Sequence, residues 1–95
     1  MHSDEPERSP ALQLQLSKQF AVGRISGPEF ETAFLRARGL NAGLDDVLAD
    51  VLIQIFYGVD DYVSDDDLRP KIRGSIDEEQ LREIVRTQLR RLDET

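Results

Sequence analysis

The chain has 95 residues, a formal net charge of −7 and no cysteine. This length is typical of one domain with a single core, and it leaves no room for a deep, enclosed active site. The absence of cysteine excludes disulfides and thiolate metal sites, and the acidic balance argues against direct binding of nucleic acid or anionic membranes. No segment approaches the ~20 apolar residues that span a bilayer, and the polar start of the chain resembles neither a signal peptide nor an anchor.

The first helix is predicted just after a polar beginning. We expect residues 1–8 to form a disordered tail and residues 9–95 to form one helical domain. Ser9 followed by Pro10 is typical of a helix start, and Gly23 is typical of a helix end. The apolar side chains of its inner face recur at four-residue spacing: Leu12, Leu16 and Phe20.

A second start signal follows after a short connection. Ser26 and Glu29 stand three residues apart, as in a capping box, and Pro28 lies in the first turn, where its missing N–H costs nothing. We expect Gly39 to close this helix. Its inner face consists of Phe30, Ala33, Phe34 and Ala37. The short link predicts that the first two helices are antiparallel neighbours.

The third helix carries the most apolar stripe of the chain. We expect a turn capped by Asn41 before it, with Asp45 and Asp46 in its first turn, where negative charge suits the helix dipole. The stripe repeats in steps of three and four residues. Its members are Leu44, Val47, Leu48, Val51, Leu52, Ile55, Phe56 and Val59. We expect Leu52 and Phe56 to be buried at the centre of the core.

A long connection separates the third helix from the fourth. Residues 60–75 contain proline and glycine, which favour irregular structure, and Ser64 is expected to cap a single turn. The fourth helix begins with Asp77 as its cap and Gln80 at the third position. Its stripe consists of Leu81, Ile84, Val85, Leu89 and Leu92. Because no segment alternates apolar and polar residues as a surface strand does, we predict an all-α fold with four helices and a long acidic loop between the third and fourth.

Negative charge is concentrated in one part of the chain. Between Gly39 and Leu68 there are eight acids and no Lys or Arg, and the rest of the chain has a net charge of +1. The stretch is interpreted either as a solvated loop or as a binding surface for a basic partner. Tyr57 and Tyr62 lie beside it, and each fits an interface or the edge of the core. The candidate binding residues are Asp46, Asp50, Tyr57, Asp60, Asp61, Tyr62, Asp65, Asp66 and Asp67.

Several separated segments together resemble a known family. They read FAVGRIS at 20–26 before Glu29, IFYGVDDY at 55–62, DLR at 67–69 and IDEEQLR at 76–82. Over roughly residues 12 to 92 the chain resembles the colicin D immunity protein family, the colicin-like self-protection proteins of bacteria. This family includes the immunity partners of contact-dependent inhibition toxins.

The resemblance implies a fold, a function and a set of contact residues. It implies an antiparallel four-helix bundle and a non-enzymatic, cytoplasmic inhibitor without a cofactor. The inhibitor binds the nuclease domain of a toxin, and in the colicin D case acidic side chains cover the basic catalytic groove of a tRNA-cleaving nuclease. The acids that fall where the family presents toxin-facing carboxylates are Asp60, Asp61, Asp65 and Asp66. We expect the free protein to be a monomer that contacts neither nucleic acid nor membrane directly.

Other functions fit the residues less well. An EF-hand needs a fixed order of acids with glycine and glutamate, and neither Asp61 nor Asp65 begins such a run. An acyl carrier protein needs Ser directly after Asp at a helix start, and no serine in the acidic region meets that. Catalysis is not expected, because the only histidine, His2, lies in the tail. The arginines at 82, 86 and 90 are interpreted as a solvated face, or as partners of acids within the chain. A different class, an acidic helical adaptor without a toxin partner, remains open.

Overall fold

The computed structural model describes residues 9–38 and 44–94 of the chain. The described part contains four α-helices, one short 3₁₀ helix and no β-strand, so the predicted all-α class is confirmed. These elements are α1 (Pro10–Ala21), α2 (Gly27–Arg36), α3 (Asp46–Asp61), η1 (Arg69–Lys71) and α4 (Glu78–Asp93).

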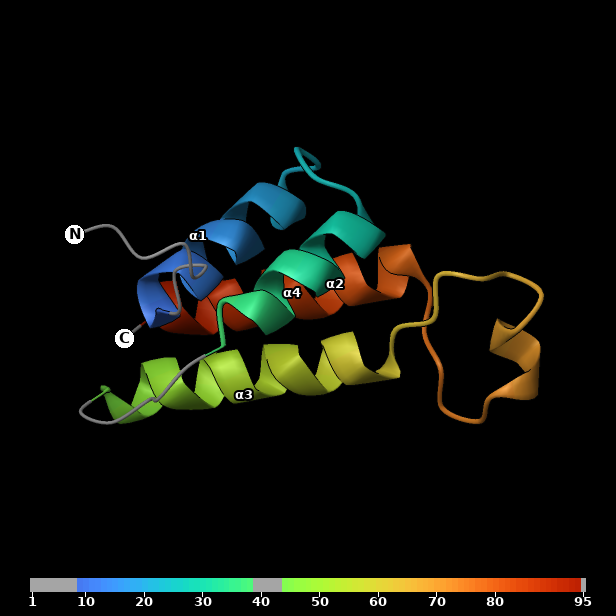
Figure 1. The fold of residues 1–95 in the computed structure, drawn as a ribbon. Helices are drawn as coiled ribbons and strands as arrows, with labels where there is room; N and C mark the ends of the chain where they lie inside the picture. The colour runs from blue at the N-terminus through green and yellow to red at the C-terminus, as the bar shows by residue number, and fades with distance from the viewer. Residues whose placement is uncertain (1–8, 39–43, 95) are drawn as a thin grey trace.

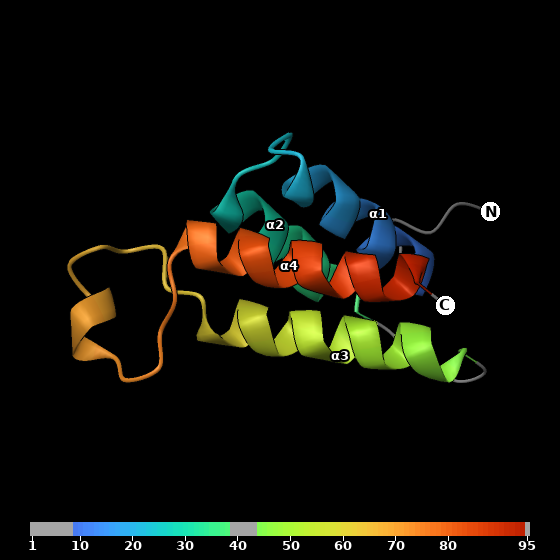
Figure 2. The same cartoon turned by 180° about the vertical axis from the view of Figure 1, so that it is seen from behind.

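The four helices pack in pairs, and α1 contacts each of the other three. Figures 1 and 2 show α3 and α4 side by side, with the chain running in opposite directions in the two helices. α4 packs against both α1 and α3, and α2 packs against α1. The connection between α3 and α4, which includes η1, projects beyond the helix ends, opposite the end at which α4 finishes (Figure 1).

Local capping explains where three of the helices begin. The Ser9 side chain accepts a hydrogen bond at the start of α1. Ser26 and Glu29 form a complete capping box on α2, and Asp77 and Gln80 form one on α4. Each cap satisfies backbone N–H groups that have no partner within the helix. All three predicted starts are confirmed.

The start of α3 differs from the prediction. Asp45 is its N-cap, not part of its first turn, because Oδ2 of Asp45 accepts hydrogen bonds from the N–H groups of Val47 at 3.1 Å and Leu48 at 3.4 Å. The carboxylate thereby satisfies two unpaired donors at once. The predicted end of the second helix at Gly39 and the turn with Asn41 lie outside the described residues.

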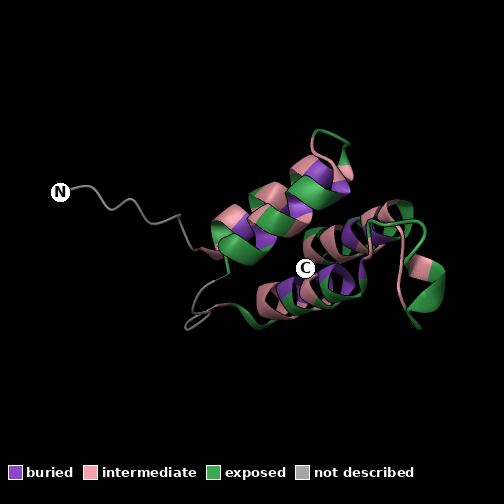
Figure 3. Cartoon of the chain, turned by 45° about the vertical axis from the view of Figure 1, so that its right-hand side comes forward, coloured by how far each residue is buried: buried purple, intermediate pink, exposed green. Residues whose placement is uncertain are grey.

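One hydrophobic core joins all four α-helices (Figure 3). The rings of Phe20 and Phe30 stack within it, with centroids 4.5 Å apart and planes 1° apart. The buried apolar residues are Phe20, Phe30, Phe34, Ala37, Val51, Leu52, Ile55, Val59, Tyr62, Leu81 and Val85. The stripes predicted for the second, third and fourth helices all contribute to this list, and Leu52 is buried as expected.

Phe56 lies at the edge of the core instead of at its centre. It is only partly buried, and the Arg38 guanidinium lies 4.1 Å from the centroid of its ring. A cation above an aromatic face is a favourable contact that needs the ring to remain accessible on one side. The expectation that Phe56 is buried at the centre is therefore wrong.

The inner face of α1 is more polar than predicted. Phe20 is fully buried, but Gln13 and Ser17 are also buried. Nε2 of Gln13 donates to the carbonyl of Phe34 at 3.4 Å, and the Ser17 hydroxyl donates to the carbonyl of Gln13 at 2.8 Å. Burial of these groups is tolerated because each has a hydrogen-bond partner.

Candidate functional site

The connection between α3 and α4 is a loop closed at its base. The N–H of Ile76 donates to the carbonyl of Asp61 at 3.0 Å, and the N–H of Val63 donates to the carbonyl of Ile76 at 3.1 Å. These two bonds flank the isolated parallel bridge between Tyr62 and Ile76. Residues 63–75 therefore begin and end at one fixed point of the helical body.

The loop is also organised internally. Oδ1 of Asp65 accepts hydrogen bonds from the N–H of Asp67 at 2.8 Å and from the N–H of Leu68 at 3.4 Å. Asp65, not Ser64, therefore caps the turn that leads into η1. A carboxylate is the stronger acceptor, since its bonds to backbone N–H groups are charge-assisted.

Arg69 ties the two sides of the loop together. Its Nε donates to the carbonyl of Val63 at 3.0 Å, and its own carbonyl accepts from the Ser75 hydroxyl at 2.7 Å. Its guanidinium also pairs with the exposed carboxylate of Asp66 at 2.7 Å. Among the described residues, every side-chain hydrogen bond or ion pair of residues 63–75 ends within this loop.

Tyr62 anchors the base of the loop to the core. It is only 6% exposed, and its hydroxyl lies against Gly27 at the start of α2. The N–H of Gly27 donates to Oε1 of Glu78 at 2.6 Å, so α2, α4 and the end of α3 meet at this junction. Burial and the nearby carboxylates raise the pKa of Tyr62. Of the two roles that the sequence left open for Tyr62, an interface or the edge of the core, the structure supports the core.

Five acids, from the end of α3 and from the loop, form an exposed group at the loop end of the molecule. We call this group, which consists of Asp60, Asp61, Asp65, Asp66 and Asp67, the acidic end. All five residues are exposed. Within the described part of the chain, the carboxylates of Asp60, Asp61 and Asp67 form no hydrogen bond or ion pair. Three bases follow at positions 69, 71 and 73, so the first half of the loop sequence is acidic and the second half is basic.

The acids predicted on α3 lie on a half-exposed face of that helix. Asp46 is exposed, and Asp50 pairs with Arg91 of α4 at 2.7 Å. The hydrogen bond from Arg91 is the main reason that the pKa of Asp50 lies below its usual value. Tyr57 is 56% exposed. Ile53, which the sequence analysis did not select, is 42% exposed between them.

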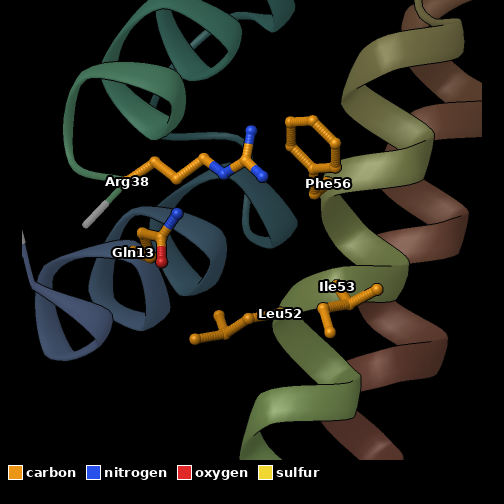
Figure 4. A pocket seen from close by; sticks show the side chains of 5 residues that line it. All are labelled: Gln13, Arg38, Leu52, Ile53 and Phe56. Carbon is orange, nitrogen blue, oxygen red and sulfur yellow. The ribbon is translucent and has the colours of Figure 1, made fainter. Parts of the chain in front are cut away.

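A shallow cavity opens beside this face of α3 (Figure 4). Its volume of about 40 Å³ is far below the several hundred cubic ångströms of a typical ligand pocket. It is lined by Gln13, Arg38, Leu52, Ile53 and Phe56. In Figure 4 the Arg38 side chain reaches from the end of α2 toward the ring of Phe56. The cavity has room for a few atoms of a partner side chain and not for a cofactor.

The arginines of α4 have a structural role that the sequence analysis missed. Nε of Arg82 donates to the carbonyl of Phe20 at 3.0 Å, and Nε of Arg86 donates to the carbonyl of Ala21 at 3.1 Å. The two cations thus satisfy carbonyls at the C-terminus of α1, where the helix dipole is negative. The predicted solvated face is wrong for Arg82, whose side chain is largely buried, but it fits Arg86 and Arg90, which are exposed. The alternative prediction, that these arginines pair with acids of the same chain, is confirmed for all three.

The described residues show no arrangement suited to binding a metal or to spanning a membrane. No group of three His, Asp or Glu side chains in residues 9–38 and 44–94 is placed to hold a metal ion. None of the described helices is long and apolar enough to cross a lipid bilayer. What this part of the chain does offer is an ordered, charged loop beside a mixed acidic and apolar helix face.

These features define a small helical protein with an exposed, charged loop beside a mixed acidic and apolar helix face. The family model of bacterial self-protective colicin-like immunity proteins matches residues 12–92. The chain therefore belongs to this family, as its segment pattern indicated, and immunity proteins of this kind neutralise a toxin. No curated protein and no solved structure shows significant similarity to the chain.

Proposed function

We propose that this chain binds a cognate bacterial toxin, a tRNA-cleaving nuclease, and neutralises it by covering its basic active-site groove with the acidic end. In this proposal the chain acts in the bacterial cytoplasm as an inhibitor without catalytic activity or cofactor. It touches neither RNA nor membrane, and it is a monomer before it meets the toxin.

The observation that carries this proposal is the exposure of unpaired carboxylates at one end of the molecule. Asp60, Asp61 and Asp67 are solvated and have no counter-ion among the described residues. A nuclease groove must be basic because it holds RNA phosphates, and its cations attract carboxylates for the same reason. Several carboxylates at one end of a protein therefore match a run of phosphates in charge.

Pre-organisation of the loop supports the same function. Backbone bonds at Val63 and Ile76 close its base, and the Asp65 cap fixes the turn behind Asp66 and Asp67. A binding segment that is already ordered loses little conformational entropy when the complex forms. The acids therefore meet the toxin without a folding step.

The scaffold in this proposal is an antiparallel four-helix bundle with the acidic loop at one end. The opposite chain directions of α3 and α4 in Figures 1 and 2 support this arrangement. The bundle holds both ends of the loop, because α3 and α4 pack against each other along their length.

Charge reversal at the acidic end tests the proposal. We expect Asp60→Lys combined with Asp61→Lys to raise the dissociation constant at least about 100-fold, since like charges face to face across an interface cost several kcal/mol. Both positions end α3, where a cation suits the helix dipole, so the melting temperature should not fall. Asp65 is left unchanged because it caps the turn.

A matched control carries the same change of charge elsewhere. Asp93→Lys combined with Glu94→Lys alters the end of α4, which is also a helix C-terminus and lies away from the loop (Figure 1). We expect this variant to protect cells that express the toxin, and the Asp60 and Asp61 variant to leave them unprotected. Equal protection by both variants contradicts the proposal and favours the adaptor class.

Salt dependence gives a second, independent measurement. Steering by exposed charges weakens as ionic strength rises, because the Debye length shortens to about 8 Å at physiological salt. We expect the wild-type association rate to fall steeply between low and physiological salt, and the charge-reversed variant to lose this slope. An association rate that does not respond to salt would place the contact elsewhere on the molecule.

A further inference from the structure

The exposed face of α3 has an apolar centre between acidic ends. Ile53 and Tyr57 are one helical turn apart and both are substantially exposed. Asp50, whose carboxylate is paired with Arg91 of α4, precedes them by one turn, and Asp60 and Asp61, whose carboxylates have no partner among the described residues, follow them by one turn. Charged groups thus flank an apolar pair along a single side of the helix.

Tyr57 is held in place from behind. Its ring lies against that of Phe56, with centroids 6.1 Å apart and planes tilted by 54°. Phe56 packs on the core and is covered by the Arg38 guanidinium at 4.1 Å. Tyr57 is therefore supported on one side by a ring that is itself held between the core and Arg38.

Ile53 connects Tyr57 to the cavity of Figure 4. Its side chain is exposed and also lines the cavity together with Leu52 and Phe56. The exposed apolar surface of α3 thus ends in a small depression that can receive the tip of one partner side chain. Protein interfaces commonly combine an aromatic anchor, a shallow apolar recess and a charged rim in this way.

We infer that Ile53 and Tyr57 form the apolar centre of the toxin interface, and that the toxin domain sets an apolar side chain beside its basic surface to meet them. This inference rests on the proposed function. The charge of the flanking positions identifies the occupant: Asp46, Asp60 and Asp61 attract a basic surface and repel an acidic one. The acids then set the association rate, and the apolar centre sets the dissociation rate.

The other exposed apolar pair of the loop is less suited to this partner. Leu68 and Ile72 lie on either side of η1, next to Lys71 and Arg73. Ile72 lies between these two cations, which repel a basic surface, whereas Leu68 directly follows the acids at 65–67, so the pair lacks a uniformly acidic surround. The loop pair therefore serves as the comparison in the experiment below.

The test uses a catalytically inactive form of the C-terminal domain of the toxin encoded beside this chain, with kinetics measured by surface plasmon resonance. We expect Tyr57→Ala to raise the dissociation constant roughly 30-fold, as truncation of an interface anchor does, almost entirely through a faster dissociation rate. The association rate and its salt slope should stay within about twofold of wild type. Tyr57→Phe should bind as wild type does, because the ring and not the hydroxyl makes the contact.

Two control variants complete the design. Val22→Ala truncates an exposed apolar side chain at the C-terminus of α1, and Leu68→Ala truncates one on the loop. Both should bind as wild type does. The substituted side chains are exposed, so helicity and melting temperature should be unchanged and should show that each variant is folded.

The possible results separate the inference from the function on which it rests. If wild type binds and Tyr57→Ala binds equally well, the inference is overturned while the proposed function stands. If Tyr57→Phe loses as much as Tyr57→Ala, the contact is polar and the apolar centre is also overturned. Loss of binding in Leu68→Ala alone moves the centre to the loop. Failure of wild type to bind the toxin domain removes both the proposed function and the inference.

Discussion

Gly27 offers a sensitive test of how the base of the loop is held. It is the first residue of α2, where replacement by alanine ordinarily favours the helix by up to ~1 kcal/mol. Here an added Cβ would meet the Tyr62 hydroxyl at less than contact distance, with Oε1 of Glu78 at 2.6 Å and Cζ of Tyr62 at 2.7 Å. Glu78 can move aside, but the Tyr62 ring is buried and rigid. We therefore expect Gly27→Ala to destabilise the fold.

The size of the effect follows from packing and from one hydrogen bond. Overpacking a filled site costs typically ~1–3 kcal/mol, and moving Glu78 also weakens its 2.6 Å bond to the N–H of Gly27. A loss of about 2 kcal/mol lowers the melting temperature of a domain of this size by roughly 8–16 °C. Thermal unfolding followed by circular dichroism measures this difference.

A double-mutant cycle identifies the cause of the loss. Tyr62→Leu removes the ring atoms that meet the added Cβ, so Gly27→Ala should cost at least ~1 kcal/mol less in that background than in wild type. Chemical denaturation of the four proteins gives the coupling energy. If Gly27→Ala melts at or above the wild-type temperature, the close packing of Tyr62 against α2 is wrong.

Two further predictions concern charged groups away from the acidic end. Arg82→Gln removes the hydrogen bond from Nε to the carbonyl of Phe20, which the N–H of Gly23 also reaches, and the ion pair with Glu78, so we expect a loss of about 1–3 kcal/mol in urea denaturation. Arg90→Gln, a surface change, should stay within ~0.5 kcal/mol of wild type. Equal midpoints for the two variants would contradict the structural role of Arg82. Burial raises the pKa of Glu31 above 4.5. The folded state therefore binds a proton at the Glu31 carboxyl more readily than the unfolded state does. As a result, the free energy of unfolding rises as pH falls through the folded pKa toward 4.5. Glu31→Gln should therefore melt at a higher temperature than wild type at pH 7 and lose most of that advantage at pH 4, whereas a constant difference between the two pH values would show that the carboxyl is not desolvated.

The helices could be predicted from the sequence because their signals are local. A cap depends on two residues three positions apart, as at Ser26 and Glu29 or Asp77 and Gln80, and neighbouring residues are enough to identify it. The apolar stripes are equally local, because they require only a repeat of three and four residues. Asp45 shows the limit of this reasoning, since a carboxylate suits both the cap and the first turn.

The contacts that sequence reasoning missed connect distant parts of the chain. The bond from Arg82 to the carbonyl of Phe20 spans 62 positions, and no spacing along α4 indicates which helix end lies opposite. Tyr62 follows the last turn of α3, where helical periodicity no longer applies, so the sequence left open whether it belonged to the core or to an interface. Ile53 is uncharged and lies outside the apolar stripe of α3, so no sequence signal marks it as a surface residue of interest. Its exposure is visible only in the structure.

The closed base of the loop has a consequence for how such a protein can change. None of residues 63–75 belongs to the hydrophobic core. Two backbone hydrogen bonds, donated by the N–H groups of Val63 and Ile76, attach this segment to the helical body. These backbone hydrogen bonds do not depend on side-chain identity. The sequence of the segment between them can therefore change while the bonds are kept. If the loop contacts the toxin as proposed, its sequence can vary with the toxin while the helices keep their packing. Within this chain of 95 residues, changes to residues 63–75 therefore need not alter the packing of the helices.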